Sequence, residues 1–466
     1  MKRFYYQTVI TILILCIGSA VHAGPFTEWE YSTADSVHGI SIQKIDSLFA
    51  DYDRIDTPGC AVSVFHEGER IFSGFYGSAN LDYNIPLGME SSFYMASVSK
   101  QFTAAAAALL IIRNELDYHV PVSEYIEEWP EWASEVQVKH LFNHTSGLPD
   151  IYALMDIGGI SISNVMELED YMEVIFRAES LKFEPGSEYS YTNSGYSSLA
   201  YLVQNISKQP FSEFVKENIL DPLDMNNTHF HDNRHKIIKN RVYSYRPGNN
   251  GFRHTYLSNF QGVGGGGLYS THNDWQHWEA FWNGRSDVSD ELQELRTIMV
   301  ITEDVSGSPL DYAKGLQIRT WKGQENIGHS GSFMGFKNDY RRYPETGYSF
   351  ITLCNRGDAE PGEKNQKLAN LFMEDVFTEF LSEFAGTYYN DELDTEYTIS
   401  VKNGELILER RLSPSGVMQQ SNGDKWGISS WEFEFYRDDN EAIAGFSLST
   451  SRAKNVDFVK TGDSTL

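Results

Sequence analysis

The most uniform hydrophobic stretch of the chain lies between Lys100 and Arg113, where no charged residue occurs. Its alanines and leucines are strong helix formers, so the pattern predicts a single buried helix that begins at Ser97. A charged lysine inside such a helix is energetically costly. Lys100 is therefore the first position in the chain that calls for a chemical explanation.

The segments before this helix predict a second helix and a hairpin. From about Ser41 to Asp53, apolar residues recur at the spacing of an amphipathic helix. Pro58-Gly59 then breaks the chain, and two β-rich runs follow at 60–65 and 71–76. These two runs predict antiparallel strands that belong to a sheet.

After the helix, the pattern is mostly helical with loops from about residue 114 to 310, and strand patterns then return. Alternating and β-rich runs predict hairpin-linked strands at 312–321, 326–336, 339–343 and 348–354. From about Phe380, short alternating runs predict a small antiparallel sheet or barrel, with strands at 396–401, 405–410, 431–436, 442–448 and 456–460. The predicted fold class is α+β: an antiparallel sheet with flanking helices and an all-α subdomain, plus a small C-terminal β-domain.

The first residues have the pattern of an export signal. Met1-Lys2-Arg3 is basic, residues 8–17 are apolar, and small residues follow up to a cleavage site at Val21-His22-Ala23. The apolar run is too short to span a bilayer comfortably. We therefore expect residues 1–23 to be a signal peptide, residues 24–380 a catalytic domain and residues 381–466 the β-domain, and we expect the mature protein to be periplasmic or secreted.

Composition narrows the choice of partners. The formal net charge is −28 and the acidic surplus is spread along the chain, which argues against nucleic acid and against an anionic membrane. No segment after the signal is long and apolar enough to span a membrane. We expect a small-molecule or peptide substrate, no nucleic acid and no stable membrane span after signal removal.

Cysteines and histidines offer few further constraints. After signal removal only Cys60 and Cys354 remain, which is too few for a disulfide scaffold, although one bridge can form if their strands are neighbours. His229, His231 and His235 are close in sequence but lack a carboxylate ligand pattern, so we interpret them as exposed loop residues. We expect neither a metal nor a cofactor.

Ser97 and Lys100 form the strongest candidate for chemistry. Three residues apart, they share one face of the predicted helix, and Ser97 lies at its N-terminus, where free N–H groups favour an oxyanion. Burial lowers the pKa of a lysine, so Lys100 could accept the proton of Ser97 and make it a nucleophile. The same spacing also occurs at Ser41–Lys44 and Ser451–Lys454, so an ordinary N-capped helix remains the alternative.

Tyr191 and Asn193 stand just before another predicted helix. Two residues apart in extended chain, their side chains point to the same side. A phenol close to a lysine ammonium is favoured as phenolate, which makes Tyr191 a candidate general base, and Asn193 offers an amide donor to a substrate carbonyl. The alternative is a buried tyrosine beside a helix-capping asparagine.

Other segments predict the walls of a site. The glycine-rich run 262–267 lacks the lysine and spacing of a phosphate loop, so we interpret it as close backbone approach near a cavity. On the late strand, Gly331 would let a ligand lie against the edge, and the N–H of Ser332 could pair with that of Ser97 as an oxyanion hole. For His144 we favour a structural role, bonded to loop backbone, over a role as base.

In this order, serine-x-x-lysine at the start of a helix, tyrosine-x-asparagine and histidine-serine-glycine on a late strand resemble the serine β-lactamase and penicillin-binding protein superfamily. The chain is most similar to the class C β-lactamase branch, which also holds D-alanyl-D-alanine carboxypeptidases, D-aminopeptidases and esterases. The segments 144–148, 222–225 and 266–271 match as well, and the resemblance covers about residues 40–380. The C-terminal domain resembles the lipocalin-like appendage of some members.

The resemblance implies a role for each residue of the site. Ser97 would be the nucleophile, Lys100 its proton partner and Tyr191 the base that later activates water, while Asn193, His329, Ser330, Gly331 and Ser332 would bind the substrate. His329 stands where β-lactamases of this branch carry a lysine that holds the substrate carboxylate. A neutral or partly protonated histidine would give a weaker, pH-dependent field, which argues against efficient penicillin hydrolysis. The literal Lys460-Thr461-Gly462 stands too close to the C-terminus to form the site wall, so we assign it to the β-domain.

The resemblance and the residues together predict an exported serine acyl-hydrolase that acts through a covalent acyl-enzyme on D-amino-acid peptides or esters. A class C β-lactamase is one alternative. A non-catalytic protein that binds or senses peptidoglycan fragments is the other.

Overall fold

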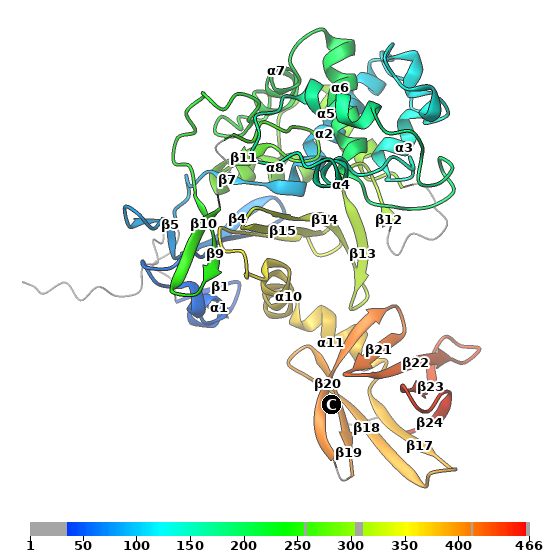
Figure 1. Ribbon diagram of the computed structural model, residues 1–466. Helices are drawn as coiled ribbons and strands as arrows, with labels where there is room; N and C mark the ends of the chain where they lie inside the picture. Colours follow the sequence, from blue (N-terminus) through cyan, green and yellow to red (C-terminus); the bar gives the residue numbers. More distant parts are fainter. Residues whose placement is uncertain (1–34, 256–258, 303–310, 412, 463–466) are drawn as a thin grey trace, which may run out of the picture.

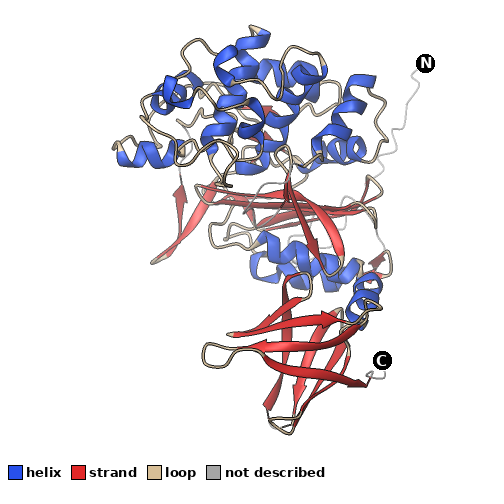
Figure 2. Ribbon diagram, turned by 90° about the vertical axis from the view of Figure 1, so that its right-hand side faces the viewer, coloured by secondary structure: helices blue, strands red, loops and turns tan. Residues whose placement is uncertain are grey.

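A computed structural model describes residues 35–255, 259–302, 311–411 and 413–462. The predicted signal peptide, residues 1–23, lies outside these residues. Two layers of helices enclose a central sheet, and a β-barrel follows beyond the second layer (Figures 1 and 2). This arrangement confirms the predicted α+β fold class with a small C-terminal β-domain.

Seven antiparallel strands form the central sheet. Their order is β12 (Asp311–Tyr312), β13 (Gln317–Trp321), β14 (Gln324–Phe333), β15 (Phe336–Tyr343), β16 (Tyr348–Cys354), β3 (Cys60–His66) and β4 (Glu69–Tyr76). The predicted N-terminal hairpin is confirmed as β3 and β4. The predicted strand 312–321 is wrong as a single element, because the chain turns at Gly315, whose φ of +76° is a conformation that glycine adopts readily.

The upper layer of helices contains most of the hydrophobic core that lies on its side of the sheet. It comprises α2 (Lys100–Ile112), α3 (Val138–Phe142), α4 (Ile151–Ile157), α5 (Leu168–Phe176), α6 (Asn193–Ser207), α7 (Phe211–Val215), α8 (His272–Trp282) and α9 (Asp290–Met299). The central helix α2 is buried throughout its alanine run, as the uncharged pattern predicts. The start of this helix differs from the prediction, because Ala96–Ser99 form a 3-10 turn (η2) and the α-helix begins at Lys100.

The lower layer covers the opposite face of the sheet. It comprises α1 (Ile42–Phe49), α10 (Pro361–Phe372) and α11 (Glu374–Ser382), and α10 packs against β15 and β16. The predicted helix 41–53 is confirmed as α1 followed by the 3-10 turn η1 (Ala50–Tyr52). Within the described residues, no helix combines the length and the apolarity needed to cross a membrane.

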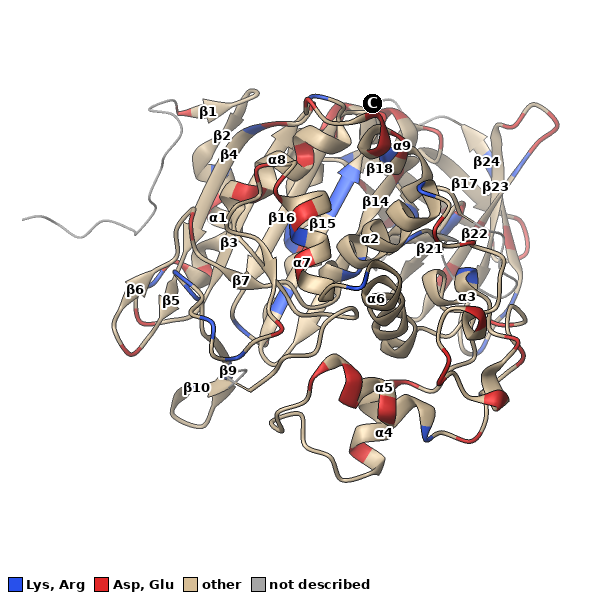
Figure 3. Cartoon of the chain, turned by 90° about the horizontal axis from the view of Figure 1, so that it is seen from above, with Lys and Arg blue, Asp and Glu red and all other residues tan. Residues whose placement is uncertain are grey.

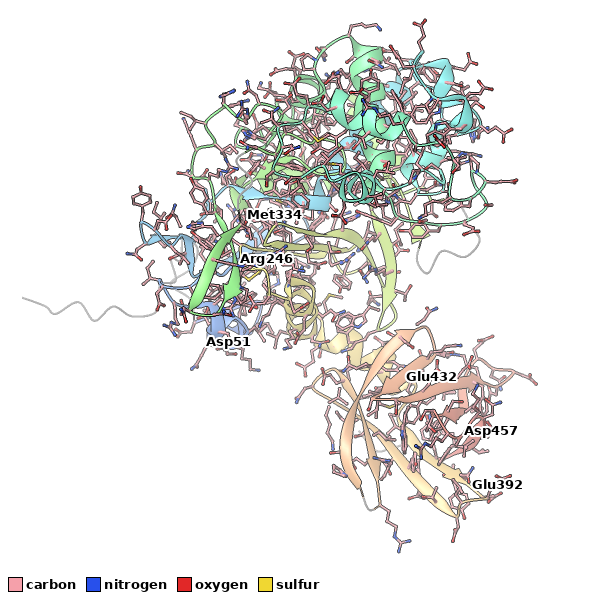
Figure 4. All side chains as sticks on the ribbon, in the orientation of Figure 1. Asp51, Arg246, Met334, Glu392, Glu432 and Asp457 are labelled. Carbon is pink, nitrogen blue, oxygen red and sulfur yellow. A yellow bond between two sulfur atoms is a disulfide. The ribbon has the colours of Figure 1, made fainter. Side chains whose placement is uncertain are left out.

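Short paired strands complete the part of the molecule that precedes the barrel. The strands pair as β1 (Ser36–Val37) with β2 (Ile40–Ser41), β5 (Ser78–Asn80) with β6 (Ile85–Pro86), β9 (Ser244–Gly248) with β10 (Gly251–Thr255), and β11 (Leu268–Ser270) with both β7 (Phe93–Tyr94) and β8 (His229–Phe230). Ser244 on β9 donates a hydrogen bond to the carbonyl of Met334 in the turn after β14, so this hairpin borders one end of β14; Figure 4 labels Met334 and Arg246 there.

A disulfide links two neighbouring strands of the sheet, β3 and β16. Cys60 on β3 lies directly opposite Cys354 on β16, and the two sulfurs are bonded. The condition set by the sequence, that the strands carrying them be neighbours, is therefore met.

The C-terminal domain is a closed antiparallel barrel of eight strands. They are β17 (Gly386–Asn390), β18 (Thr395–Lys402), β19 (Glu405–Arg410), β20 (Ser413–Asn422), β21 (Lys425–Ile428), β22 (Trp431–Arg437), β23 (Ile443–Ser449) and β24 (Val456–Gly462). Large side chains fill its interior, among them the buried Tyr388, Trp426, Phe433 and Phe446. Its outer surface carries acidic residues, of which Glu392, Glu432 and Asp457 are labelled in Figure 4.

The position of Lys460-Thr461-Gly462 confirms its assignment to the β-domain, because these residues lie in β24 of the barrel. The predicted domain boundary after residue 380 falls within α11, the helix that leads from the sheet to the barrel. The exact boundary stays a prediction.

Candidate active site

Ser97 lies in the 3-10 turn η2, between β7 and the buried helix α2. Ala96 precedes it in a left-handed conformation with φ of +50°, which is unusual for a residue with a side chain. The Oγ of Ser97 accepts a hydrogen bond of 3.2 Å from the Lys100 ammonium, and Ser97 is partly exposed. The turn thus presents a hydroxyl to solvent while its proton partner stays buried.

Lys100 is fully buried, with 0% of its side chain exposed. Besides Ser97, its Nζ donates to Oδ1 of Asn193 at 2.8 Å and to the carbonyl of Gly265 at 2.7 Å. Burial lowers the pKa of Lys100 to about 7, and the carboxylate of Asp150 acts in the opposite direction. At neutral pH a substantial fraction of Lys100 is therefore the free amine, which can accept a proton.

Asp150 fixes the position of Asn193. Its Oδ2 accepts hydrogen bonds from the backbone N–H of Asn193 at 2.7 Å and from the side-chain Nδ2 at 2.9 Å. Its Oδ1 accepts the N–H of Tyr152 and so caps α4. Asn193 therefore presents Oδ1 to Lys100 in a fixed orientation, with one amide hydrogen already engaged.

Tyr191 closes the site over the lysine. Its ring centroid lies 4.9 Å from the Lys100 Nζ, and its phenol shares a hydrogen bond with the Ser97 hydroxyl. Burial raises the pKa of Tyr191 above its usual range, and the bond to Ser97 offsets only part of this increase. The phenolate expected from the sequence is therefore disfavoured, because the effect of burial on the pKa of Tyr191 outweighs that of the Ser97 hydrogen bond. The free enzyme holds a neutral phenol beside a lysine that titrates near neutrality.

The edge of β14 forms the other wall. A Cβ added to Gly331 would lie 2.5 Å from the carbonyl oxygen of Met95 and 3.3 Å from the backbone nitrogen of Ser97, so glycine is required for this contact. The pairing of β13 with β14 ends at Gly328, and from His329 onward β14 pairs, among the described residues, only with β15. The β14 edge beside Ser97 is therefore open for a ligand, with Ser330 and Ser332 exposed on it.

His329 is buried and neutral. Its Nδ1 bonds to the carbonyl of Ser330 at 2.5 Å and its Nε2 to the phenol of Tyr312 at 2.9 Å. Burial lowers the pKa of His329 to about 3, with a further contribution from Lys100. The prediction of a pH-dependent positive field at this position is therefore wrong at neutral pH, because both ring nitrogens form hydrogen bonds and the ring is uncharged.

The structure confirms the structural interpretation of His144. The histidine is fully buried, its Nδ1 accepts the N–H of Thr192 at 3.2 Å, and its ring lies 4.2 Å from that of Tyr191. It thus supports the segment that carries Tyr191 and Asn193.

The predicted surface position of His229 and His231 is wrong. His231 is buried, and the ring of His229 stacks on Tyr269. Within the described residues, no group of three or more histidine, cysteine, aspartate or glutamate side chains is placed to hold a metal ion.

Asp150, Gly265 and Tyr312 hold the site together, yet sequence reasoning missed all three as site residues. Pro149 separates Asp150 from the His-Thr-Ser-Gly-Leu segment, and the only local signal of Asp150 was that of a helix cap. Gly265 belongs to the glycine run, whose interpretation as close backbone approach is confirmed: a Cβ there would lie 3.1 Å from Oδ1 of Asn193. Tyr312 had no signal, because it acts through a contact between distant segments.

The chain is similar to known proteins in sequence and in fold. The family model described as Beta-lactamase matches residues 45–372. The D-aminopeptidase of Gluconobacter oxydans (strain 621H) is 27% identical over 317 residues, which are 68% of this chain and 59% of that protein. Penicillin-binding protein 4* of Bacillus subtilis (strain 168) is 25% identical over 379 residues, which are 73% of this chain and 81% of that protein.

A solved structure extends the likeness in fold. The octameric penicillin-binding protein homologue from Pyrococcus abyssi has a TM-score of 0.63 at 21% identity, covering 90% of this chain and all of that one. The chain thus spans about three fifths of the length of the D-aminopeptidase it matches, and most of that of the two penicillin-binding relatives.

Proposed function

This chain belongs to the beta-lactamase family, and we propose that it is an exported serine acyl-hydrolase that acts on D-amino-acid peptides or esters. The observation that carries the proposal is the contact between the Ser97 hydroxyl and a fully buried Lys100. Because the pKa of Lys100 is about 7, a substantial fraction of this lysine is free amine at neutral pH, and this fraction can take the serine proton.

The acylation step follows from the contacts around Ser97. Ser97 Oγ attacks the substrate carbonyl carbon, and its proton passes to the free amine of Lys100. The N–H groups of Ser97 and Ser332 would hold the developing oxyanion, since Gly331 keeps β14 close to the serine. The neutral phenol of Tyr191 is placed to deliver a proton to the leaving amine or alkoxide and to be reprotonated from Lys100.

Deacylation uses the same groups in the opposite sense. Water attacks the acyl carbon, loses its proton to the Tyr191–Lys100 pair, and Ser97 regains a proton as the ester bond breaks. Asn193 and Asp150 keep the lysine in place through both steps. No cofactor is needed for this chemistry.

D-amino-acid substrates are proposed because the matched relatives include D-aminopeptidases. The uncharged His329 supports an amide or ester substrate over a β-lactam, because it supplies no positive charge for a penicillin carboxylate. Penicillin hydrolysis is the second candidate, favoured by the similarity to penicillin-binding protein 4*. A protein that only binds peptidoglycan fragments would keep the fold but have no need of a lysine poised to titrate.

Export is supported by two observations. The basic and apolar pattern of residues 1–23 is that of a signal peptide. The Cys60–Cys354 disulfide is the kind of bond that persists in oxidising compartments such as the periplasm.

Turnover assays test the proposal. Wild type and Ser97→Ala are compared on D-alanine p-nitroanilide, p-nitrophenyl acetate and a chromogenic cephalosporin. Ser451→Ala is the matched control, because Ser451 has the same spacing to a lysine but lies exposed near the end of the barrel. We expect hydrolysis of the anilide or the ester by wild type and the control and none by Ser97→Ala; equal turnover by Ser97→Ala would refute the assignment, and turnover of the cephalosporin alone would favour the β-lactamase.

A further inference from the structure

A polar basin lies beneath the open edge of β14, on the face of the sheet opposite the α2 helix. Its volume is about 510 Å³, and residues of β13, β14, β15, the start of α10 and the barrel strand β20 line it. Ser330, Gly331 and Ser332 of β14 belong to both the basin and the candidate active site. The basin is therefore continuous with the edge along which a substrate would lie.

The alternation of β14 separates the two sides of this edge. His329 pairs across the sheet with Tyr340, whose phenol bonds to Glu279 of α8, so this face turns toward the upper helices. Ser330 pairs with Asp339, whose carboxylate bonds to Asn365 of α10, so this face turns toward the basin. An extended chain paired with the edge would place alternate side chains above and below it. With the reacting residue facing the nucleophile, the neighbouring residue would face the basin.

Positive charge prevails in the basin. Arg319, Lys337 and Arg341 line it against two carboxylates, Asp339 and Glu360. The carboxylate of Asp339 is already engaged, because Oδ1 lies 3.1 Å from the Arg341 guanidinium and Oδ2 accepts a bond from Asn365. Figure 3 shows blue segments on β15, near the middle of the view.

Arg341, which lines the basin, has one side-chain nitrogen without a partner. Arg341 is only 8% exposed, and its Nη1 is buried without a hydrogen-bond partner among the described residues, while Nη2 is held by Gln317 and Asp339. A buried guanidinium N–H left unpaired is costly, and a carboxylate is the acceptor that fits a guanidinium best. Residues 360–362 at the N-terminus of α10 also line the basin, where the positive end of the helix dipole favours an anion.

We propose that this basin is a subsite for the carboxylate side chain of the substrate residue next to the reacting one, so that the enzyme prefers acidic D-peptides. This inference rests on the proposed function, because it assumes that the substrate lies along β14 beside Ser97. Gln420 and Ser421 of β20 close the far end of the basin, which gives the barrel a part in substrate selection. His329 supplies no positive charge above the edge of β14, whereas the cationic residues of the basin supply it below that edge.

The test compares isosteric peptides that differ only in charge. N-acetylated tripeptides with D-alanine in the middle carry D-Glu or D-Gln at either the first or the third position, and the C-terminus is amidated. Their affinities for the Ser97→Ala protein are measured by titration calorimetry, which requires no turnover. We expect the D-Glu peptide to bind about tenfold more tightly than its D-Gln partner in at least one position, as a charge-assisted hydrogen bond allows.

Two further variants show whether the basin causes this preference. Arg319→Gln removes a charge at an exposed position, and Gln366→Glu adds a carboxylate on the exposed face of α10 without a change of size. Both should abolish the preference for D-Glu, whereas Arg253→Gln in the exposed hairpin strand β10 should preserve it. Thermal melting confirms that each variant is folded.

Equal affinity for D-Glu and D-Gln peptides, no measurable binding of any of them, or a preference that survives both basin variants would each overturn the subsite. Hydrolysis of p-nitrophenyl acetate by wild type, measured separately, shows whether the proposed function still holds when the subsite does not.

Discussion

Replacing Asp150 by asparagine should move the pH dependence of acylation to lower pH. The Asp150 carboxylate raises the pKa of Lys100, whose own value is lowered by burial to about 7. One side-chain amide separates the two charges, with contacts of 2.8 Å and 2.9 Å on its two sides. Removal of the carboxylate therefore removes a stabilising partner of the ammonium and favours the free amine.

The magnitude follows from Coulomb's law. Two charges about 7 Å apart interact by about 2 kcal/mol at an effective dielectric constant of about 20. Asp150 is partly exposed, so solvent screening reduces this to about 1 kcal/mol, which corresponds to somewhat less than one pH unit. In wild type, kcat/KM should rise with pH through an apparent pKa of about 7. In Asp150→Asn, the rise should come somewhat less than one pH unit earlier.

The assay measures kcat/KM for p-nitrophenyl acetate between pH 5 and 9, with product quantified after acid quench so that the ionisation of nitrophenol does not interfere. The plateau at high pH reports geometry, and we expect it to fall in Asp150→Asn because Asn193 loses an acceptor. Asp156→Asn, an exposed position on the same helix, is the control for general charge effects. A rise that stays in place or moves to higher pH in Asp150→Asn would refute the electrostatic account of Lys100.

Three further predictions follow from single contacts. Gly331→Ala should lower kcat/KM by about 100-fold or more, because the added Cβ would collide with Met95 and displace the Ser97 turn. The control is Gly416→Ala in the barrel, which should leave the rate unchanged because the nearest contact of its Cβ would be an ordinary 3.4 Å. The free energy of unfolding of wild type, relative to Lys100→Met, should increase by up to ~1.4 kcal/mol per pH unit as pH rises from about 7 to about 10. The reason is that Lys100 keeps its proton in this range in the unfolded chain but not when it is buried. Chemical denaturation at several pH values measures this free energy, and a decrease with pH would contradict the prediction. Cys60→Ser should lower the free energy of unfolding by about 2–4 kcal/mol and make the melting temperature insensitive to a reductant. If the melting temperature of wild type were already insensitive to the reductant, this would argue against the bridge.

The sequence predicted those parts of the fold whose patterns are local. The uncharged run after Lys100 predicted the buried helix, and the alternating runs predicted most strands of the sheet and the barrel. Strands β20 and β21 were missed because polar residues such as Gln419, Gln420 and Ser421 interrupt the alternation, and their pairing depends on the closure of the barrel. The break at Gly315 was missed because its cause is distant: a Cβ there would lie 2.6 Å from the backbone of Lys100.

The candidate site shows the same division between local and distant causes. Ser97 with Lys100, Tyr191 with Asn193, and the segment from His329 to Ser332 have local motifs, and the structure brings all of them to one place. Asp150 and the carbonyl of Gly265 have no distinctive pattern, since any helix cap or backbone oxygen looks alike in a sequence. The protonation states were also beyond the sequence, because they depend on how deeply Lys100, Tyr191 and His329 are buried.

The central claim is that Ser97 becomes covalently acylated during turnover. The most direct test is peptide mapping by mass spectrometry of the protein acid-quenched during hydrolysis of p-nitrophenyl acetate. The account predicts one acetyl group on the peptide that contains Ser97, absent from Ser97→Ala and lost when substrate is exhausted. An acetyl group that forms and turns over on another residue, or Ser97-independent hydrolysis with no adduct, would contradict it.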